Sequence, residues 1–297
     1  MFTGLSAFPL TPLNGRTVDE SAFERLVGRL VEANVDSIGA LGSTGSYAYL
    51  SRAERARVTE LAVRNAGDVP VIAGISALST LDVLQYAEDV QKAGAKAVLL
   101  SPMSYQKLND EEVYNLYKTV TSQLSVPLCV YDNPGTTNFQ FTDELHGRIA
   151  QLSNVRSIKI PGVPASLEQA RTRVDQLRSK IPAHVTIGVS GDASAAMGLN
   201  VGCDAWYSVI GGLFPHTARE LLNAAQEGSA TEATRLSERL QPLWSLFGEA
   251  GGSIRVIAAA AEIVGLVNEP CLPAPLKSVS GDLREKLARV IHELQLH

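Results

Sequence analysis

The sequence contains little cysteine, and what it contains is widely spaced. Its 297 residues include three cysteines, Cys129, Cys203 and Cys271. An odd number at wide spacing provides neither a disulfide framework nor the close pairs of a structural zinc site. We therefore expect each cysteine to be a small buried side chain and the protein to be located in the reducing cytoplasm.

Basic patches and long hydrophobic runs are also lacking. Charged residues make up 19% of the sequence, the formal net charge is −5, and Lys and Arg form no run. Nucleic acids and anionic membranes attract basic patches, so neither is an expected partner, and a small molecule is the better interpretation. The opening MFTGLSAFPL has no basic region, and the longest apolar run, residues 256–267, is interrupted by Glu262. We therefore expect no export signal and no membrane span.

What the sequence does have is an alternation of strand-like and helix-like segments. Hydrophobic residues make up 45% of the chain, which is enough for a substantial core. Short apolar or β-branched runs predict strands at residues 5–10, 37–41, 69–75, 97–101, 127–131, 155–160, 184–190 and 205–210. Apolar residues at helical spacing predict helices at residues 19–33, 51–65, 79–93, 110–124, 142–152, 166–178, 193–201 and 215–227.

Eight strand–helix units match the count of a closed (β/α)8 barrel of the TIM type, with an open doubly wound sheet as the alternative. At roughly 150 residues per domain the length suggests two domains, but one barrel with an appendage fits equally well. We predict an α/β protein with a barrel over residues 1–228 and a C-terminal helical extension over residues 229–297. The extension is rich in Leu, Ala, Glu and Arg and is interrupted by Pro270, Pro273 and Pro275.

Catalytic groups of such a barrel lie at the carboxyl ends of its strands. Lys159 in the strand VRSIKIPG is flanked by Ile158 and Ile160, so its ammonium must enter the barrel or face the helices. A desolvated lysine has a lowered pKa and supplies the neutral amine that attacks a carbonyl to form a Schiff base. The alternative is a lysine at a strand end that extends to solvent.

Three loops hold further candidates. The turn Gly42-Ser43-Thr44-Gly45 follows the second strand and can hold a carboxylate, or it is an ordinary turn. Tyr131 ends the fifth strand, beside the strand of Lys159, and can transfer protons there, or it is a half-buried tyrosine before a Pro-Gly turn. Tyr105, after strand four, is another candidate hydroxyl, although an isolated loop aromatic more often packs.

Other polar residues carry weaker signals. Asp192 is a candidate base, but its place before a predicted helix favours N-terminal capping. Gly211 and Gly212 follow the eighth predicted strand, where some barrels bind phosphate, but no phosphate-binding sequence motif accompanies them. The histidines form no HxH or HExxH arrangement, so we predict no catalytic metal; they are His146, His184, His216, His292 and His297.

Five segments taken together resemble the dihydrodipicolinate synthase and N-acetylneuraminate lyase family. They are MFTGLSAFPLTPL, GSTG, YDNPGTT, SIKIPG and the later SGD. The resemblance implies a (β/α)8 barrel with class I aldolase chemistry, in which Lys159 forms a Schiff base with pyruvate or another 2-oxo acid and no separate cofactor is needed.

The resemblance also implies roles for other residues. Tyr131 matches the proton-transfer tyrosine, Ser43 and Tyr105 match its hydroxyl relay, and Thr44 matches the residue that holds the carboxylate. Tyr207 falls where a backbone carbonyl lines the site, and Gly191 and Thr136 are further substrate-binding candidates. Because the family's relay tyrosine comes from a neighbouring subunit, the implied assembly is a homotetramer or a dimer.

Three positions depart from the family pattern. Thr136 stands where dihydrodipicolinate synthases place an arginine for the carboxylate of aspartate semialdehyde, and a hydroxyl cannot replace its charge-assisted bonds. Ser46 replaces a glutamate. Leu78 stands where feedback-inhibited synthases have an amide, so we expect no feedback control by lysine.

These departures favour a second substrate that presents hydroxyl groups, such as a 2-keto-3-deoxy sugar acid. We therefore predict a lyase that joins or cleaves pyruvate and an aldehyde, as an aldolase or a dehydratase. The alternatives are an authentic 4-hydroxy-tetrahydrodipicolinate synthase, which condenses pyruvate with aspartate semialdehyde, and a non-catalytic 2-oxo-acid-binding protein. A third alternative, a phosphate-binding barrel enzyme, is supported only by Gly211 and Gly212.

Overall fold

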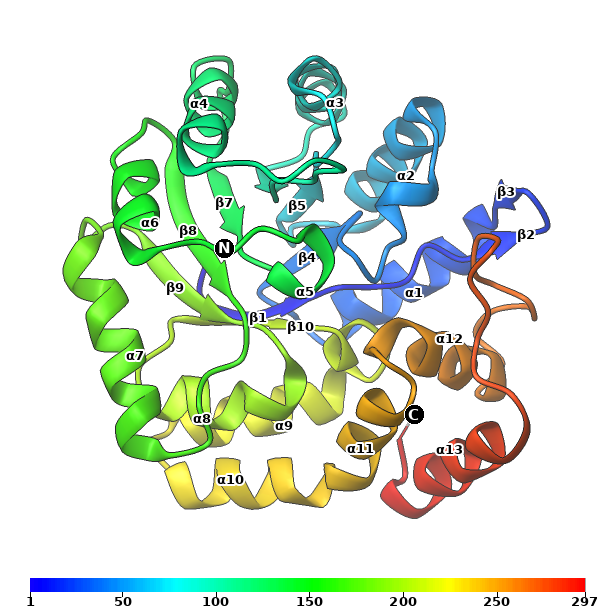
Figure 1. Ribbon diagram of the computed structural model, residues 1–297. Helices are drawn as coiled ribbons and strands as arrows, with labels where there is room; N and C mark the ends of the chain where they lie inside the picture. Colours follow the sequence, from blue (N-terminus) through cyan, green and yellow to red (C-terminus); the bar gives the residue numbers. More distant parts are fainter. Residues whose placement is uncertain (297) are drawn as a thin grey trace.

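The computed structural model describes residues 1–296, and its central feature is a closed parallel barrel. The strand order is β1-β10-β9-β8-β7-β6-β5-β4, and Figure 1 shows the barrel ringed by helices. Its strands are β1 (Gly4–Ala7), β4 (Ser37–Ala40), β5 (Val71–Gly74), β6 (Ala97–Leu100), β7 (Leu128–Tyr131), β8 (Val155–Ile160), β9 (Thr186–Val189) and β10 (Ala205–Ser208). The predicted (β/α)8 barrel is confirmed, and the open sheet is wrong.

The helices around the barrel follow the strands in the predicted order. They are α1 (Glu20–Glu32), α2 (Arg52–Asn65), α3 (Thr80–Lys92), α4 (Asp110–Thr121), α6 (Asp143–Ala150), α7 (Leu167–Lys180), α8 (Ala195–Asn200) and α9 (Pro215–Gln226). Their apolar stripes face the strands, as in α1, where Phe23, Leu26 and Leu30 are fully buried. Ser51 begins α2 with a capping box, since its hydroxyl accepts from the Glu54 N–H.

The structure contains several short strands and helices that the sequence patterns do not predict. The antiparallel pair β2 (Leu13–Asn14) and β3 (Thr17–Val18) follows β1, and the helix α5 (Pro134–Thr137) replaces the expected Pro-Gly turn. Proline suits the first position of a helix because it has no N–H to satisfy there. Three 3₁₀ turns are η1 (Tyr47–Tyr49), η2 (Asp192–Ser194) and η3 (Ile210–Gly212).

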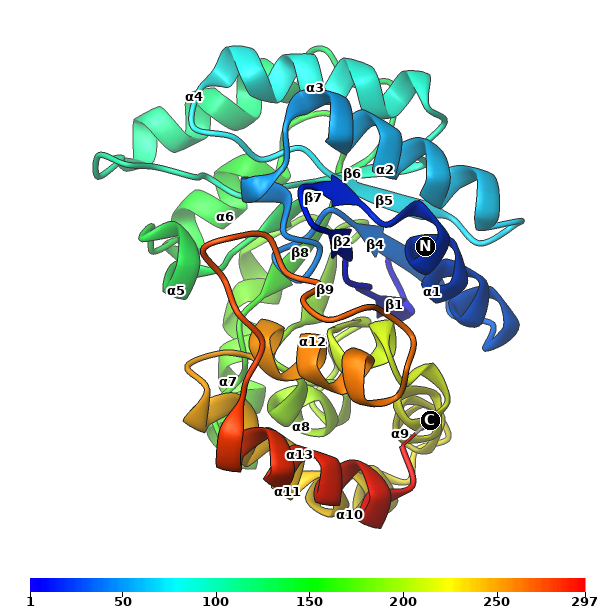
Figure 2. The same ribbon diagram turned by 90° about the vertical axis from the view of Figure 1, so that its right-hand side faces the viewer.

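The C-terminal extension is helical, as predicted. It contains α10 (Ala230–Arg239), α11 (Gln241–Glu249), α12 (Ser253–Ile263) and α13 (Gly281–Leu294), and its last residue, His297, lies outside the described residues. Figure 2 shows these helices beneath the barrel, with α12 between the barrel and α13. The α10 helix packs on α8 and α9, and α11 reaches η2 at the carboxyl end of the barrel. The extension therefore adjoins the end where catalytic groups are expected.

Two further expectations concern burial and length. Cys129, Cys203 and Cys271 are free and buried, which confirms the interpretation of the cysteines as small core residues. Within residues 1–296, every helix is too short or too polar to cross a bilayer.

Candidate active site

A cavity of about 710 Å³ opens at the carboxyl end of the barrel. The barrel side of its wall includes Phe8, Ser43, Thr44, Tyr131, Asn133, Thr136, Lys159, Gly191 and Tyr207. The C-terminal extension completes the wall with Trp244, Phe247, Ser253 and Arg255. The structure thus brings together most of the residues that the sequence singles out, and it adds a wall that local patterns do not indicate.

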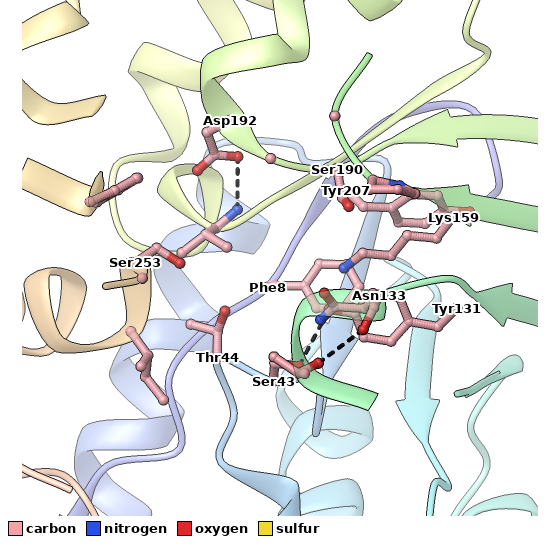
Figure 3. Close-up of a pocket in the computed structure, with 18 of the residues that line it drawn as sticks. Phe8, Ser43, Thr44, Tyr131, Asn133, Lys159, Ser190, Asp192, Tyr207 and Ser253 are labelled. Carbon is pink, nitrogen blue, oxygen red and sulfur yellow. Dashed lines mark hydrogen bonds between the residues drawn. The ribbon is translucent and has the colours of Figure 1, made fainter. Parts of the chain in front are cut away.

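Lys159 lies on β8 with its side chain inside the barrel (Figure 3). Its Nζ is 4.0 Å from the centre of the Phe8 ring and 4.2 Å from that of Tyr131, and the residue is 4% exposed. Burial lowers the pKa of the Lys159 ammonium from 10.5 to about 8. A useful fraction of the amine is therefore neutral near pH 7, which is the form that attacks a carbonyl carbon. Of the two interpretations of Lys159, the extension to solvent is wrong.

Two glycines make room for the aromatic ring beneath Lys159. A Cβ built on Gly39 would lie 2.4 Å from the Phe8 ring, and one on Gly42 would lie 2.6 Å from it. Only glycine allows this approach, so the glycines of β4 and of the following turn determine where Phe8 packs. Phe8 in turn gives the lysine an apolar, weakly solvating neighbour.

Tyr131 lies directly beside Lys159 because the two residues are in register between β7 and β8. Its hydroxyl oxygen is 3.3 Å from that of Ser43 and accepts a hydrogen bond of 2.8 Å from Asn133 Nδ2 (Figure 3). Burial raises the pKa of the Tyr131 phenol, so the phenol keeps its proton at neutral pH. It can donate that proton to an oxygen at the lysine and recover it through Ser43.

The turn that carries Ser43 and Thr44 lies between two residues with left-handed backbone, Leu41 at φ 57° and Ser46 at φ 55°. Such backbone in non-glycine residues is uncommon and concentrates at functional sites. Thr44 is directed into the cavity in Figure 3. The Oγ of Ser46 is buried without a hydrogen-bond partner within residues 1–296. These features are typical of functional turns, and the carboxylate-holding role of the turn stays a prediction.

The remaining predicted site residues have varied positions. Gly191, at φ +81°, and Thr136 line the cavity. Tyr207 does so too, with its ring centred 5.6 Å from Lys159 Nζ, and its hydroxyl lies 2.6 Å from the Ser157 hydroxyl and accepts from Cys129 Sγ. Tyr105 is 90% exposed and lies outside the cavity of its own chain.

The expectation that Asp192 caps a helix is wrong. Asp192 accepts hydrogen bonds from Trp206 Nε1 and from the backbone N–H groups of Val209 and Ile210, at 3.0, 3.2 and 2.7 Å. The capping prediction depended on the position of Asp192 before a helix, but its hydrogen-bond donors come from β10 and the segment after it. Both oxygens accept hydrogen bonds, so Asp192 holds that segment in place, which is a structural role as expected but not a helix cap.

Gly211 and Gly212 also have partners inside the chain. The Gly211 N–H donates to the Ser208 hydroxyl at 2.8 Å, and the Gly212 N–H donates to the Val209 carbonyl at 3.0 Å. These amides are therefore not free to bind a phosphate. The part of the chain that the structure describes has no group of three His, Cys, Asp or Glu arranged for a metal ion, and the expected absence of a catalytic metal stays a prediction.

Sequence reasoning missed Phe8, Asn133 and the extension residues. Asn133 was visible within the segment YDNPGTT, and its place two residues after Tyr131 was the available signal. Phe8 and Arg255 had no such signal, because their contacts with the site join segments far apart in the chain. Asn133 aligns the phenol, since its amide can only donate through Nδ2.

A closed (β/α)8 barrel with a buried lysine and tyrosine at the carboxyl ends of adjacent strands defines an enzyme of the lyase class, built for aldolase-type chemistry. The model of the dihydrodipicolinate synthetase family matches residues 1–294, and the chain belongs to this family.

Relatives of known sequence and structure agree with this assignment. The chain is 32% identical over 289 residues to 4-hydroxy-tetrahydrodipicolinate synthase of Parvibaculum lavamentivorans, covering 95% of each chain. It is 30% identical over 299 residues to the enzyme of that name from Archaeoglobus fulgidus, covering 100% of this chain and 99% of the other. The crystal structure of dihydrodipicolinate synthase from Agrobacterium tumefaciens matches with a TM-score of 0.94 and 44% identity, covering 99% and 98% of the two chains.

Two tyrosines of the cavity offer a matched comparison. We expect Tyr131→Phe to slow the proposed reaction by about 10²- to 10⁴-fold, because the Tyr131 ring is centred 4.2 Å from Lys159 Nζ, against 5.6 Å for Tyr207, and its hydroxyl is paired with Ser43. Tyr207→Phe should change the rate by less than about fivefold, because its hydroxyl faces Ser157 and loses a bond worth only about 1 kcal/mol. Steady-state kinetics and thermal melts of both variants test this, and equal loss of rate in the two would contradict it.

Proposed function

We propose that the protein is a Schiff-base-forming lyase that joins or cleaves pyruvate and an aldehyde. The observation that carries the proposal is the buried Lys159, whose pKa is lowered to about 8, in register with Tyr131. Lysine in this state is a nucleophile for a ketone, and the neighbouring phenol can serve the proton transfers.

Each step can be assigned to a group in the cavity. The neutral Lys159 Nζ adds to the C2 carbonyl of pyruvate, and the carbinolamine hydroxyl leaves as water after it takes a proton from Tyr131. The Tyr131 phenolate then takes a methyl proton from the resulting iminium, which gives an enamine. The enamine carbon forms a bond with the aldehyde carbon while Tyr131 returns that proton to the aldehyde oxygen. Water adds to the new iminium and gives its proton to the Tyr131 phenolate, and collapse of this carbinolamine releases the product and the free Lys159 amine. Cleavage is the same sequence reversed.

Thr44 and Ser43 act around the reacting atoms. We assign Thr44 to the carboxylate of the 2-oxo acid, because its hydroxyl is directed into the cavity and can donate to an anion (Figure 3). Ser43 returns protons to Tyr131 across 3.3 Å. Gly191 and Thr136 border the space for the second substrate.

The second substrate distinguishes two forms of the proposal. We favour a 2-keto-3-deoxy acid, with aldolase or dehydratase chemistry, because Thr136 brings no positive charge to the rim and its hydroxyl only contacts the Asn133 carbonyl at 3.4 Å. The name of the relatives favours the alternative, synthesis of 4-hydroxy-tetrahydrodipicolinate from pyruvate and aspartate semialdehyde. A non-catalytic 2-oxo-acid-binding protein is the second alternative.

We also propose that a neighbouring copy in a homotetramer or dimer supplies Tyr105. A tyrosine that is 90% exposed is available to another molecule. One structural neighbour, with a TM-score of 0.91 and 26% identity over 100% of this chain, is described as the first monomeric dihydrodipicolinate synthase variant, so sedimentation is needed alongside kinetics of Tyr105→Phe. The buried thiols suit the reducing cytoplasm, where we place the enzyme.

Trapping of the adduct tests the proposal. Incubation with pyruvate and borohydride should reduce the iminium to a secondary amine, and peptide mapping should locate one pyruvate-derived group on Lys159. An unmodified Lys159 peptide would overturn the proposal. Adduct formation without turnover of 2-keto-3-deoxy acids, of aspartate semialdehyde or of any member of a broad aldehyde panel would favour the non-catalytic alternative.

A further inference from the structure

The cavity wall contributed by the C-terminal extension carries a positive charge that the reaction does not use. Within residues 1–296, only three cavity-lining side chains are charged: Lys159, Asp192 and Arg255. Lys159 is the proposed nucleophile, and both oxygens of Asp192 accept hydrogen bonds from inside the chain. Arg255 is therefore the cation that is available to a bound molecule.

The structure holds Arg255 in place without neutralising it. One nitrogen, Nη1, donates to the Lys277 carbonyl at 3.0 Å, and this bond joins the first turn of α12 to the segment before α13. Among the described residues, no carboxylate forms an ion pair with Arg255. A guanidinium has five donors in a planar fork, so the other donors stay available for a second partner.

The start of α12 adds to this positive region. Ser253 is the first residue of α12, and no side chain caps the helix. The backbone N–H groups of Ser253 and Ile254 have no acceptor within residues 1–296. Such amides and the helix dipole favour an anion at this end. Figure 3 shows Ser253 across the cavity from Lys159, with Phe8 and Thr44 between them.

We propose that Arg255, supported by the first turn of α12, binds a carboxylate at the far end of the second substrate. The fork of the guanidinium matches the two oxygens of a carboxylate. The inference rests on the proposed function and specifies its substrate class: the aldehyde, or the 2-oxo acid that is cleaved, carries a second carboxylate remote from the reacting carbon. The charge absent at Thr136 is thus provided from another part of the chain.

Condensation of pyruvate with matched aldehydes tests the assignment. The wild-type protein should use succinic semialdehyde with a kcat/KM about tenfold to hundredfold above that for butyraldehyde, which has the same chain length and no charge. Arg255→Gln should lose this preference through a higher KM for succinic semialdehyde, with the KM for pyruvate unchanged. Arg289→Gln, at an exposed position on α13, is the matched control and should behave like the wild type.

The outcomes separate this inference from the proposed function. If the pyruvate adduct forms and Arg255→Gln keeps the preference for the charged aldehyde, or if the wild type has no such preference, the role of Arg255 is wrong and the lyase proposal stands. If no adduct forms, the lyase proposal fails. Calorimetry with glutarate, a dicarboxylate, then tests whether Arg255 binds a carboxylate. Weaker binding of glutarate to Arg255→Gln than to Arg289→Gln would support the anion site, and equal binding would overturn it.

Discussion

A Lys159→Met variant should capture no pyruvate and should nevertheless be more stable than the wild-type protein at pH 7. Covalent capture should vanish because the amine that forms the iminium is gone. Stability should rise because the ammonium is buried and has no ion pair among the described residues, while the faces of the Phe8 and Tyr131 rings, 4.0 and 4.2 Å from Nζ, offset only part of its lost hydration. Methionine fills a similar space without a charge.

The expected gain follows from the pKa of Lys159. Burial lowers it from 10.5 to about 8, so the folded protein binds its proton more weakly than the unfolded chain does. The resulting penalty is on the order of 3 kcal/mol below pH 8 and disappears as the pH rises toward 10.5. Chemical denaturation from about pH 7 to pH 10 should therefore show a difference between variant and wild type that shrinks with pH.

An exposed lysine provides the control for this measurement. Lys118 on α4 is solvent-exposed, and Lys118→Met should change the unfolding free energy by less than about 0.5 kcal/mol while leaving pyruvate capture intact. A Lys159→Met variant that is less stable than the wild type would show that the ammonium has favourable partners in the folded protein. In that case the low pKa would need another cause.

The second large effect concerns a buried pair behind Tyr131. Asp132 and His146 are 3% and 0% exposed, and His146 Nε2 lies 3.6 Å from Asp132 Oδ2. Both imidazole nitrogens and Asp132 Oδ1 have no hydrogen-bond partner within residues 1–296. Burial raises the pKa of Asp132 from 3.8 to about 7 and lowers that of His146 from 6.5 to about 3. The ring of Phe141 stacks on His146, and the ion-paired Arg173 and Asp143 are the charges that act on the pair, Arg173 lowering both pKa values and Asp143 raising that of Asp132.

The two groups have opposite effects on the pH dependence of stability. Asp132 contributes to the free energy of unfolding below pH 3.8, and this contribution is lost as the pH rises toward 7. The contribution of His146 to the free energy of unfolding is present above pH 6.5 and is lost as the pH falls toward 3. From about pH 4 to pH 6.5 the pair holds one proton in either state of the chain. In the unfolded chain the proton is on the imidazole, and in the folded protein it is on the carboxyl, so the two slopes cancel.

An Asp132→Asn variant should remove the cancellation. Relative to the wild type, its unfolding free energy should fall by about 1.4 kcal/mol for each unit of pH between about pH 6 and pH 4.5. Urea denaturation across this range measures the slope. The double variant Asp132→Asn/His146→Leu should return to the wild-type slope, because both titrating groups are gone. If Asp132→Asn alone showed the same pH slope of the unfolding free energy as the wild type, His146 would not be neutral in the folded protein.

Much of this fold could be predicted because its signals are local. A parallel strand that is buried on both faces is an uninterrupted apolar run, and eight such runs alternate with helical stripes. The same logic identified Lys159, since a lysine between two isoleucines of such a strand must be buried or at its end. The pairing with Tyr131 followed from adjacent parallel strands, whose carboxyl ends meet.

The rest could not be predicted because its partners are distant in the chain. Asp192 precedes a helix and so predicts a cap, yet the donors that it meets are on Trp206 and the residues after β10. Ser43 meets Tyr131 across 88 positions. Arg255 reaches the cavity only because the extension packs against the carboxyl end of the barrel, which no periodicity indicates.

The division of the cavity wall between barrel and extension has an evolutionary consequence. The proposed nucleophile and its proton donor are on strands, where a one-residue slip would disrupt the core, while Arg255 follows the exposed loop of Gly251 and Gly252. These two glycines have φ of +67° and +142°, which other residues adopt only with strain, so the loop tolerates insertions better than replacement of either glycine. A library of insertions in this loop and substitutions at residues 253–255 should therefore diversify substrate range faster than one spread over the barrel.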